Sequence, residues 1–180
     1  MEPSSGTSAR LDLKTFVRDI PDFPIPGILF KDIMPLIGDG SALRQSVDDL
    51  LAPFREARID AIAAVEARGY LLAAPMACAL GVGLIPVRKP GKLPYKTISQ
   101  DYSLEYGKNT LEMHDDACKP GARVLIVDDL IATGGSARAA GHLIERVGGT
   151  VAGFAFLIEL GFLNGRQALD GYTVHSVLNY

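Results

Sequence analysis

The segment Val124–Ala137, V-L-I-V-D-D-L-I-A-T-G-G-S-A, constrains this chain more than any other part of it. Its four apolar residues Val124–Val127 are typical of a buried strand, and the acids Asp128 and Asp129 follow them directly. The stretch Thr133–Ser136, T-G-G-S, then predicts a glycine turn that opens a helix. Because ligands of parallel sheets bind at the carboxyl ends of strands, this arrangement predicts a ligand site.

The predicted turn suits an anion. A helix N-terminus presents backbone N–H groups without intrahelical partners, together with the positive end of the helix dipole. Thr133 and Ser136 add hydroxyl donors, while Asp128 and Asp129 can accept hydrogen bonds from sugar hydroxyls. The alternative is that the two acids only cap the helix, but adjacent acids at a buried strand end are costly without a partner. The segment therefore predicts a sugar-phosphate site.

Two other nucleotide-binding loops are absent from the sequence. No lysine follows Gly134-Gly135, so the pattern G-x-x-x-x-G-K-[ST] does not occur here. The dinucleotide pattern G-x-G-x-x-G does not occur anywhere in the chain, which disfavours a nicotinamide-dependent dehydrogenase.

Helical and strand-like patterns alternate along the chain. Helical spacing of apolar residues predicts four helices, at Leu13–Ile20, Leu43–Phe54, Gly69–Gly81 and Ala139–Val147. Besides Val124–Val127, short apolar runs predict four strands, at Ile59–Val65, Gly83–Val87, Val151–Leu160 and Tyr172–Leu178. This alternation predicts an α/β fold with a mostly parallel central sheet flanked by helices. We expect a single domain over residues 1–180, with residues 1–10 disordered.

Two segments depart from this alternation. The prolines and glycine of residues 21–27 predict an extended, turning segment that continues through Ile28–Asp32. Leu93–Met113 is polar and weakly alternating, with few aliphatic residues. We expect this second segment to leave the core as a hairpin or lid.

Composition excludes several classes of protein. The net charge of −3 and the pI near 5.6 argue against a broad nucleic-acid surface. Tyr70–Val87 lacks charge, but its prolines and glycines indicate a helix followed by a strand rather than a membrane span. Cys78 and Cys118 are far apart, and Met1–Arg10 does not resemble a secretory signal. We expect a cytoplasmic protein that contacts neither nucleic acid nor membrane.

At Val124–Ser136 the sequence resembles the type I phosphoribosyltransferases, whose signature is four apolar residues, two acids, two apolar residues and a Thr-Gly-rich loop. This resemblance implies transfer of ribose 5-phosphate from phosphoribosyl pyrophosphate to a nitrogen base, with Mg²⁺ held mainly by the substrate diphosphate. Four further segments resemble the adenine phosphoribosyltransferases within this family, namely Phe23–Ile33, Val65–Tyr70, Arg88–Pro94 and Tyr102–Lys108. They extend the resemblance from about Leu13 to Tyr180 and imply the family fold.

The adenine branch of the family implies purine salvage, in which adenine and phosphoribosyl pyrophosphate give AMP and diphosphate. It also implies an N-terminal hood, a mobile hairpin arm over residues 94–108, and a homodimer, the commonest symmetric assembly. Transfer to a 6-oxopurine or to orotate is the alternative reaction. A non-catalytic sensor of phosphoribosyl pyrophosphate is a further alternative, although the chain has no basic segment to bind nucleic acid.

The resemblance implies roles for four groups of residues. The ribose 5-phosphate would contact Asp128, Asp129, Ala132, Thr133, Gly134, Gly135 and Ser136. The diphosphate would contact Glu66, Ala67, Arg68, Lys89 and Lys92. The base would contact Ile28, Leu29, Phe30 and Leu160, and the catalytic residues would be Glu105 and Arg68.

Several of these roles have simpler alternatives. Arg68, Lys89 and Lys92 could be solvated surface charges, and Glu105 could be a solvated residue of an exposed hairpin. Ala67 stands where relatives often carry serine, and Lys31 where many carry arginine. We expect an unusual backbone at Glu66-Ala67, including a cis peptide bond, and no catalytic role for the three histidines, His114, His142 and His175.

Overall fold

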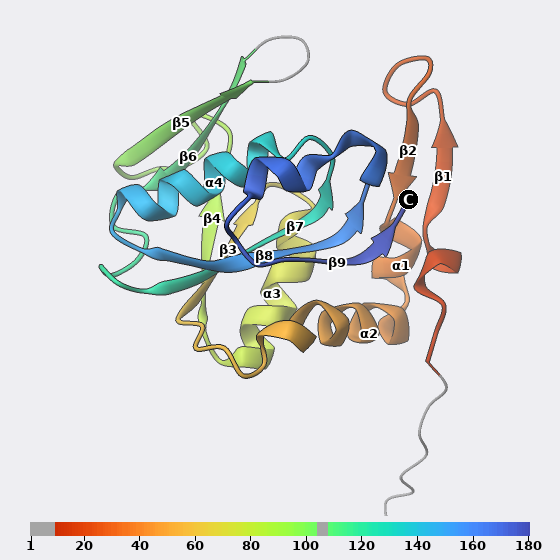
Figure 1. The fold of residues 1–180 in the computed structure, drawn as a ribbon, viewed down its shortest axis with the longest axis horizontal. Coiled ribbons are helices and arrows are strands. Elements are labelled where there is room, and N and C mark those ends of the chain that lie inside the picture. The colour runs from red at the N-terminus through yellow and green to blue at the C-terminus, as the bar shows by residue number, and fades with distance from the viewer. Residues whose placement is uncertain (1–9, 104–107) are drawn as a thin grey trace, which may run out of the picture. The chain divides into compact units, whose positions relative to one another are not determined.

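The computed structural model describes residues 10–103 and 108–180, and the chain divides into two compact units, residues 1–46 and residues 47–180 (Figure 1). The division falls within helix α2 (Gly40–Leu51). The prediction of a single domain over residues 1–180 stays a prediction, and the disorder expected for residues 1–10 concerns residues that lie almost entirely outside the described part.

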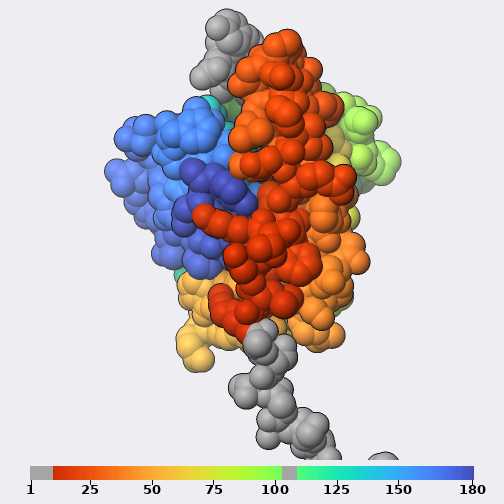
Figure 2. Space-filling view, turned by 90° about the vertical axis from the view of Figure 1, so that its right-hand side faces the viewer, coloured from red at the N-terminus to blue at the C-terminus, as the bar shows by residue number. Residues whose placement is uncertain are grey.

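The first unit is built around an antiparallel ribbon of two strands. It contains η1 (Leu13–Phe16), β1 (Arg18–Pro21), β2 (Leu29–Asp32), α1 (Met34–Gly38) and the first half of α2. Within the ribbon, Lys31 Nζ lies 2.6 Å from Asp19 Oδ1, and the rings of Phe23 and Phe30 meet edge to face. Figure 2 shows this ribbon as a continuous red and orange surface. The ribbon occupies the N-terminal segment to which the resemblance assigns a hood.

The helix predicted over Leu13–Ile20 is wrong in its second half. Only Leu13–Phe16 is helical, as a single 3-10 turn, and Ile20 lies in β1 opposite Phe30. Pro21 cannot continue a helix, and a strand at this position gains a partner in β2. The spacing of apolar residues carried no information about that partner.

The second unit is a parallel sheet of five strands in the order β4-β3-β7-β8-β9. The strands are β3 (Ala61–Val65), β4 (Gly83–Val87), β7 (Arg123–Ile131), β8 (Thr150–Glu159) and β9 (Val174–Asn179). Helix α4 (Gly135–Arg146) covers one face of the sheet and α3 (Gly69–Leu80) the other (Figure 1). The predicted α/β class with a parallel sheet between helices is confirmed.

The three central strands supply the core. The residues of β7 from Val124 to Val127 have no exposed surface, and α4 buries Leu143 and Ile144 on the sheet. Burial of a large aliphatic side chain stabilises a fold by about 1.5–3 kcal/mol, so this contact fixes the strand that carries the two acids. The remaining helical turns are η2 (Ala52–Phe54), η3 (Gly161–Leu163) and η4 (Gly165–Leu169).

The polar segment after β4 forms a separate antiparallel pair, β5 (Thr97–Ser103) and β6 (Lys108–His114). A hairpin was predicted over Leu93–Met113, and the described part of the segment is indeed a hairpin. Within the second unit, it is joined to the central sheet where Arg88, the residue after β4, pairs with Glu112 of β6. Whether residues 94–108 move as an arm stays a prediction.

Candidate active site

A cavity of about 300 Å³ opens at the carboxyl ends of β3 and β7. Its walls combine the turn after β3, the end of β7, the loop that follows, and one residue of the hairpin. The lining residues are Val65, Glu66, Ala67, Arg68, Tyr102, Asp128, Asp129, Leu130, Ile131, Ala132, Thr133, Gly134, Ser136 and Ala137. Sequence segments about sixty residues apart therefore meet at the edge of the sheet where parallel-sheet ligands bind.

Asp128 and Asp129 lie within β7 rather than after it, which corrects the prediction that the strand ends before them. Pairing of β7 with β3 stops at Val127, whereas pairing with β8 continues to Ile131. The acids therefore stand in extended backbone held on one side only. Asp128 Oδ1 accepts a hydrogen bond of 2.9 Å from the N–H of Asp129.

The two carboxyl groups share an electrostatically unfavourable position. Burial and the adjacent charge of Asp129 raise the pKa of Asp128 well above its ordinary value. Burial also raises the pKa of Asp129, and the nearby Arg68 guanidinium offsets only part of that effect. Such a pair gains stability from any ligand that brings hydroxyl donors or positive charge into the cavity.

Arg68 approaches the pair from the opposite wall. Its Nε lies 2.7 Å from Asp129 Oδ2, and yet this contact lacks the alignment of a hydrogen bond. Among the described residues, no group donates a hydrogen bond to Asp129 Oδ2, although the atom is buried. The charge of this oxygen is compensated by Arg68, but its capacity to accept a hydrogen bond is unused by the described residues and is available to a ligand hydroxyl group.

The loop after β7 carries the residues of the predicted anion cradle. Helix α4 starts at Gly135, preceded by Gly134 with a φ of 80°, which a glycine adopts without strain. The first N–H groups of the helix have no acceptor within the helix. Ala132, Thr133, Gly134 and Ser136 line the cavity, and Gly135 lies between the last two. The predicted phosphate cradle and the acid pair are thus parts of one cavity.

The turn after β3 is braced by a basic residue that the predicted site omitted. The peptide bond between Glu66 and Ala67 is cis, as expected. Glu66 accepts hydrogen bonds from Arg88 Nε at 2.7 Å and from the N–H of Lys89 at 2.8 Å. Burial acts to raise the pKa of Glu66, but these two hydrogen bonds outweigh it and the pKa lies below its ordinary value. These two hydrogen bonds to the Glu66 carboxylate therefore tie the turn after β3 to the residues that follow β4.

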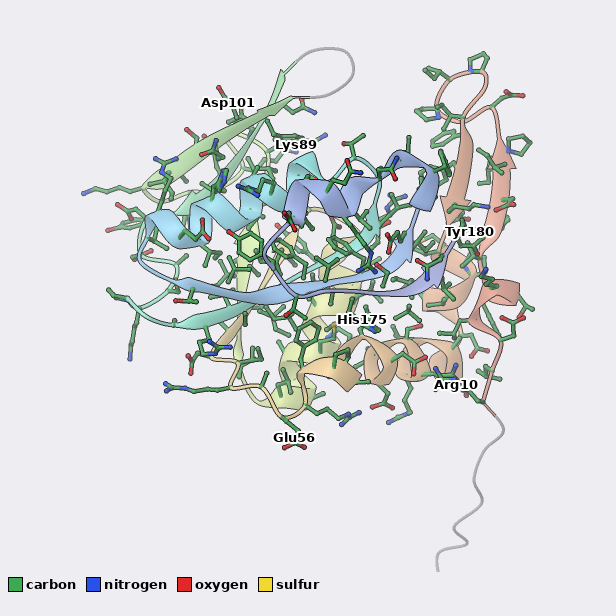
Figure 3. All side chains as sticks on the ribbon, viewed as in Figure 1. Arg10, Glu56, Lys89, Asp101, His175 and Tyr180 are labelled. Carbon is green, nitrogen blue, oxygen red and sulfur yellow. The ribbon has the colours of Figure 1, made fainter. Side chains whose placement is uncertain are left out.

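The two predicted lysines stand outside the cavity lining. Lys89 is exposed at the end of β4 and reaches the site region through its backbone N–H, while the carbonyl of Lys92 accepts a hydrogen bond from Arg88 Nη1. Lys89, labelled in Figure 3, follows the carboxyl end of β4. Arg88 could have been found in the sequence, because it begins the basic run R-K-P-G-K.

The predicted base-binding residues belong to both units. Ile28, Leu29 and Phe30 lie at and just before β2 in the first unit, where Ile28 and Leu29 are exposed. Leu160 follows β8 in the second unit, and its N–H donates to the carbonyl of Ile131 at 3.0 Å. Glu105 lies outside the described residues.

Tyr102 on β5 lines the cavity, and the predicted site did not include it. It also packs against the core, and burial raises the pKa of its hydroxyl group. None of the three histidines lines the cavity. His175 lies on the sheet face opposite α4 (Figure 3), where its Nε2 is 3.0 Å from the carbonyl oxygen of Asp49.

Two further findings concern metals and membranes. Among residues 10–103 and 108–180, no three His, Cys, Asp or Glu side chains cluster in a way that could hold a metal ion. No helix in the same ranges combines the length and apolar character needed to cross a bilayer.

Comparison with known proteins gives consistent likenesses. Residues 37–172 match the family described as Phosphoribosyl transferase domain. The adenine phosphoribosyltransferase of Desulfitobacterium hafniense (strain Y51) is 57% identical over 170 residues, which cover 94% of this chain and 98% of that protein. The structure of the adenine phosphoribosyltransferase of Thermoanaerobacter pseudethanolicus has a TM-score of 0.91 and 51% identity, covering 93% of this chain and 98% of that one.

A third likeness includes a liganded protein. The structure of the adenine phosphoribosyltransferase of Saccharomyces cerevisiae, complexed with D-2,5-dideoxy-2,5-imino-altritol 1,6-bisphosphate and adenine, has a TM-score of 0.87 at 41% identity. It covers 92% of this chain, which in turn covers 96% of that one. Together with the arrangement of the acid pair and the anion cradle in one cavity, these likenesses confirm the family that Val124–Ser136 predicted. This chain belongs to the phosphoribosyltransferase family, among the adenine phosphoribosyltransferases.

Proposed function

We propose that this chain transfers the 5-phosphoribosyl group of phosphoribosyl pyrophosphate to adenine, giving AMP and diphosphate in a purine salvage route. One observation carries the proposal, namely that the acid pair Asp128-Asp129, the anion cradle at 132–136 and Arg68 share one cavity. A sugar phosphate needs hydroxyl acceptors and an anion site a few ångströms apart, and this cavity provides both.

The reaction breaks the bond between the anomeric carbon and the diphosphate oxygen, and forms a bond from that carbon to a ring nitrogen of adenine. Positive charge develops on the ribose and negative charge on the leaving diphosphate. We assign Asp128 and Asp129, which line the cavity, to accept from the ribose hydroxyls and to stabilise the positive charge. Arg68, on the opposite wall, is the cation assigned to the diphosphate. The N–H groups at the start of α4 hold the 5-phosphate.

Mg²⁺ belongs to this proposal as the metal of the substrate complex. Mg²⁺ is typically bound by one or two carboxylates together with substrate phosphates and water, rather than by a cage of protein ligands. The described residues fit this mode, because two adjacent carboxylates, Asp128 and Asp129, line the cavity and would supply one or two oxygen ligands. When bound, Mg²⁺ neutralises charge on the diphosphate and makes it a better leaving group.

By the family resemblance, we assign recognition of adenine to the backbone of Leu29, and contacts with its ring to Phe30 and Leu160. Adenine presents an amino donor beside a ring acceptor, and a carbonyl and an N–H of one residue match that pair. Hypoxanthine reverses both groups. Glu105, assigned from the resemblance, would donate or position the proton that moves between ring nitrogens. Lys89 and Lys92 would add positive charge beside the diphosphate.

A homodimer is part of the proposal, and one face of the second unit supports it. Exposed residues of α3 (Leu71, Ala74 and Cys78) lie on one stripe, and Leu84 and Pro86 are exposed on the edge strand β4 beside it. No charged residue occurs between positions 70 and 87. A two-fold interface sets a face against its own copy, and an uncharged face does so without like-charge repulsion. Leu71→Glu should convert the dimer to a monomer in light scattering, and an unchanged mass would exclude this face.

The two cysteines, Cys78 and Cys118, are free thiols. Lone thiols persist where the surroundings are reducing. We therefore place the enzyme in the cytoplasm, where phosphoribosyl transfer in purine salvage would take place.

The test of the function is an assay with phosphoribosyl pyrophosphate, Mg²⁺ and a panel of bases that includes adenine, hypoxanthine, guanine and orotate. We expect AMP and diphosphate from adenine, with a preference of at least about a thousandfold in kcat/KM over the oxopurines, because each buried donor–acceptor mismatch costs about 1–3 kcal/mol. Turnover of hypoxanthine or orotate instead would support the alternative reaction. No turnover with any base, despite tight binding of phosphoribosyl pyrophosphate, would support a sensor.

A further inference from the structure

The phosphate-binding loop rests against the 3-10 helix η4, backbone against backbone. A Cβ atom on Gly165 would stand 2.2 Å from the carbonyl oxygen of Ala132 and 2.9 Å from Ile131 Cγ1. A Cβ atom on Gly134 would stand 2.4 Å from the carbonyl oxygen of Gly165. Two glycines, one on each side, thus allow η4 and the loop to touch. Because nothing separates them, a displacement of η4 displaces the loop.

Arg138 fastens η4 to the helix that begins at the loop. Its Nη1 donates to the carbonyl of Ala168 in η4 at 2.9 Å, and its Nε donates to His142 Nε2 at 2.8 Å. The guanidinium carbon lies 6.0 Å from the centre of the Tyr172 ring. Figure 1 shows η4, in blue, beside the first part of α4. A planar guanidinium that makes directed contacts to three groups has little freedom to move.

The other side of η4 is fastened by a second arginine. Arg166 Nε lies 2.7 and 2.9 Å from the two carboxylate oxygens of Glu159, and its Nη1 donates to the carbonyl of Val174 at 2.8 Å. Arg166 thus ties η4 to β8 and β9, whereas Arg138 ties it to α4. These contacts form a closed circuit. Helix α4 continues from the loop, Arg138 on α4 binds η4, and η4 in turn contacts the loop.

We propose that Arg138 is a positioning residue, which fixes the phosphate-binding loop in its anion-binding shape through η4. The inference rests on the proposed function of that loop. Arg138 does not line the cavity, so its effect is on the geometry of the N–H donors and not on direct contact with substrate. Small displacements of positioning groups can weaken binding and catalysis by about 10-fold to 100-fold.

The test compares Arg138→Gln and Arg138→Lys with Arg146→Gln. Arg146 lies two turns further along α4 and donates to the carbonyl of Ser99, far from η4 in the contact network, so its variant controls for a lost arginine on the same helix. For each protein, calorimetry gives the Kd for ribose 5-phosphate, steady-state kinetics give both KM values, and thermal unfolding gives Tm.

For Arg138→Gln we expect the Kd for ribose 5-phosphate and the KM for phosphoribosyl pyrophosphate to rise by about 10-fold or more, with the KM for adenine within about twofold of wild type. Arg138→Lys keeps a charged N–H donor but loses the planar guanidinium that binds several acceptors at once, so its Kd should rise by about 3-fold to 10-fold. Arg146→Gln should keep the wild-type Kd. If Arg138→Gln does not fold, the Kd of Arg138→Lys decides.

A lower Tm with unchanged Kd in the Arg138 variants would mean that the arginine only stabilises the fold, and would overturn the inference. Equal rises in Kd in the Arg138 and Arg146 variants would also overturn it. Absence of ribose 5-phosphate binding by the wild-type protein would sink the proposed function together with this inference. Wild-type binding that Arg138→Gln leaves intact sinks this inference alone.

Discussion

Arg68 Nε lies 2.7 Å from Asp129 Oδ2, so the cation assigned to the diphosphate and an acid assigned to the ribose oppose each other across one cavity. Arg68 comes from the turn after β3 and Asp129 from β7. They place a positive and a negative charge where a ligand that carries both an anionic group and hydroxyl donors would bind. Substrate binding therefore has to replace this contact with contacts to the substrate.

Arg68→Gln should lower kcat/KM for phosphoribosyl pyrophosphate by about 100-fold or more, because a positioned cation on a leaving group is worth about 10²–10³ in rate. It should also move the acidic limb of ribose 5-phosphate binding to higher pH, since the guanidinium holds down the pKa of Asp129. Steady-state kinetics measures the first effect, and calorimetric titration of ribose 5-phosphate across pH measures the second. Arg58→Gln, at an exposed ion pair with Asp60, is the control and should match wild type. Matching values for Arg68→Gln would remove its role.

The acid pair should make the ligand-free protein less stable as pH rises. The pKa of Asp128 is raised in the folded state, so its favourable contribution is full below the unfolded value and is lost as pH rises through the folded value. Asp128→Asn removes the ionisable group and therefore this pH-dependent loss of stability. Its Tm should exceed that of wild type by about 2–4 °C near neutral pH, which corresponds to about 1 kcal/mol, and the difference should shrink toward acid pH. Parallel curves of Tm against pH for the two proteins would contradict the shift.

Gly134 and Gly121 form a matched pair for testing the loop. Their φ angles are 80° and 77°, but only at Gly134 would a Cβ atom collide with backbone, whereas nothing lies within 4 Å of one at Gly121. Gly121→Ala should cost about 1–2 kcal/mol from left-handed backbone alone. Gly134→Ala should cost more and should also raise the KM for phosphoribosyl pyrophosphate. Equal losses of Tm with unchanged KM would show that η4 does not set the loop.

Adenine recognition by backbone gives a distinct signature at Leu29. Leu29→Ala leaves the backbone C=O and N–H in place, so the preference for adenine over hypoxanthine should stay above about a thousandfold. Phe30→Ala should instead raise the KM for adenine while sparing the KM for phosphoribosyl pyrophosphate. Steady-state kinetics with both bases measures the two ratios. Loss of the preference in Leu29→Ala would assign recognition to the side chain.

The sequence predicted those parts of the structure that depend on local pattern. Val124–Val127 had to be buried on both faces, and the glycines at 134–135 had to open a helix, so β7, the loop and α4 were foreseen. The end of β7 was misplaced because Asp128 and Asp129 resemble a strand terminator. Pairing with β8, which continues to Ile131, decides the matter and is not visible in β7 alone.

Long-range contacts account for what the sequence could not reveal. The contact between Gly134 and Gly165 joins positions 31 residues apart, and neither glycine differs locally from one in an ordinary turn. Glu66 was assigned to diphosphate, but its carboxylate is engaged by Arg88. That ion pair also joins distant segments, since residues 66 and 88 are brought together only when β3 and β4 pair.

The central claim is that Asp128 and Asp129 hold the ribose, and kcat/KM for phosphoribosyl pyrophosphate tests it most directly. Asp128→Asn and Asp129→Asn each replace a charged acceptor of a hydroxyl hydrogen bond, an interaction worth about 1.5–3 kcal/mol. Each variant should therefore lose about 10-fold to 150-fold in kcat/KM. Folded variants that both keep the wild-type kcat/KM would contradict the account and show that this loop is not the ribose site.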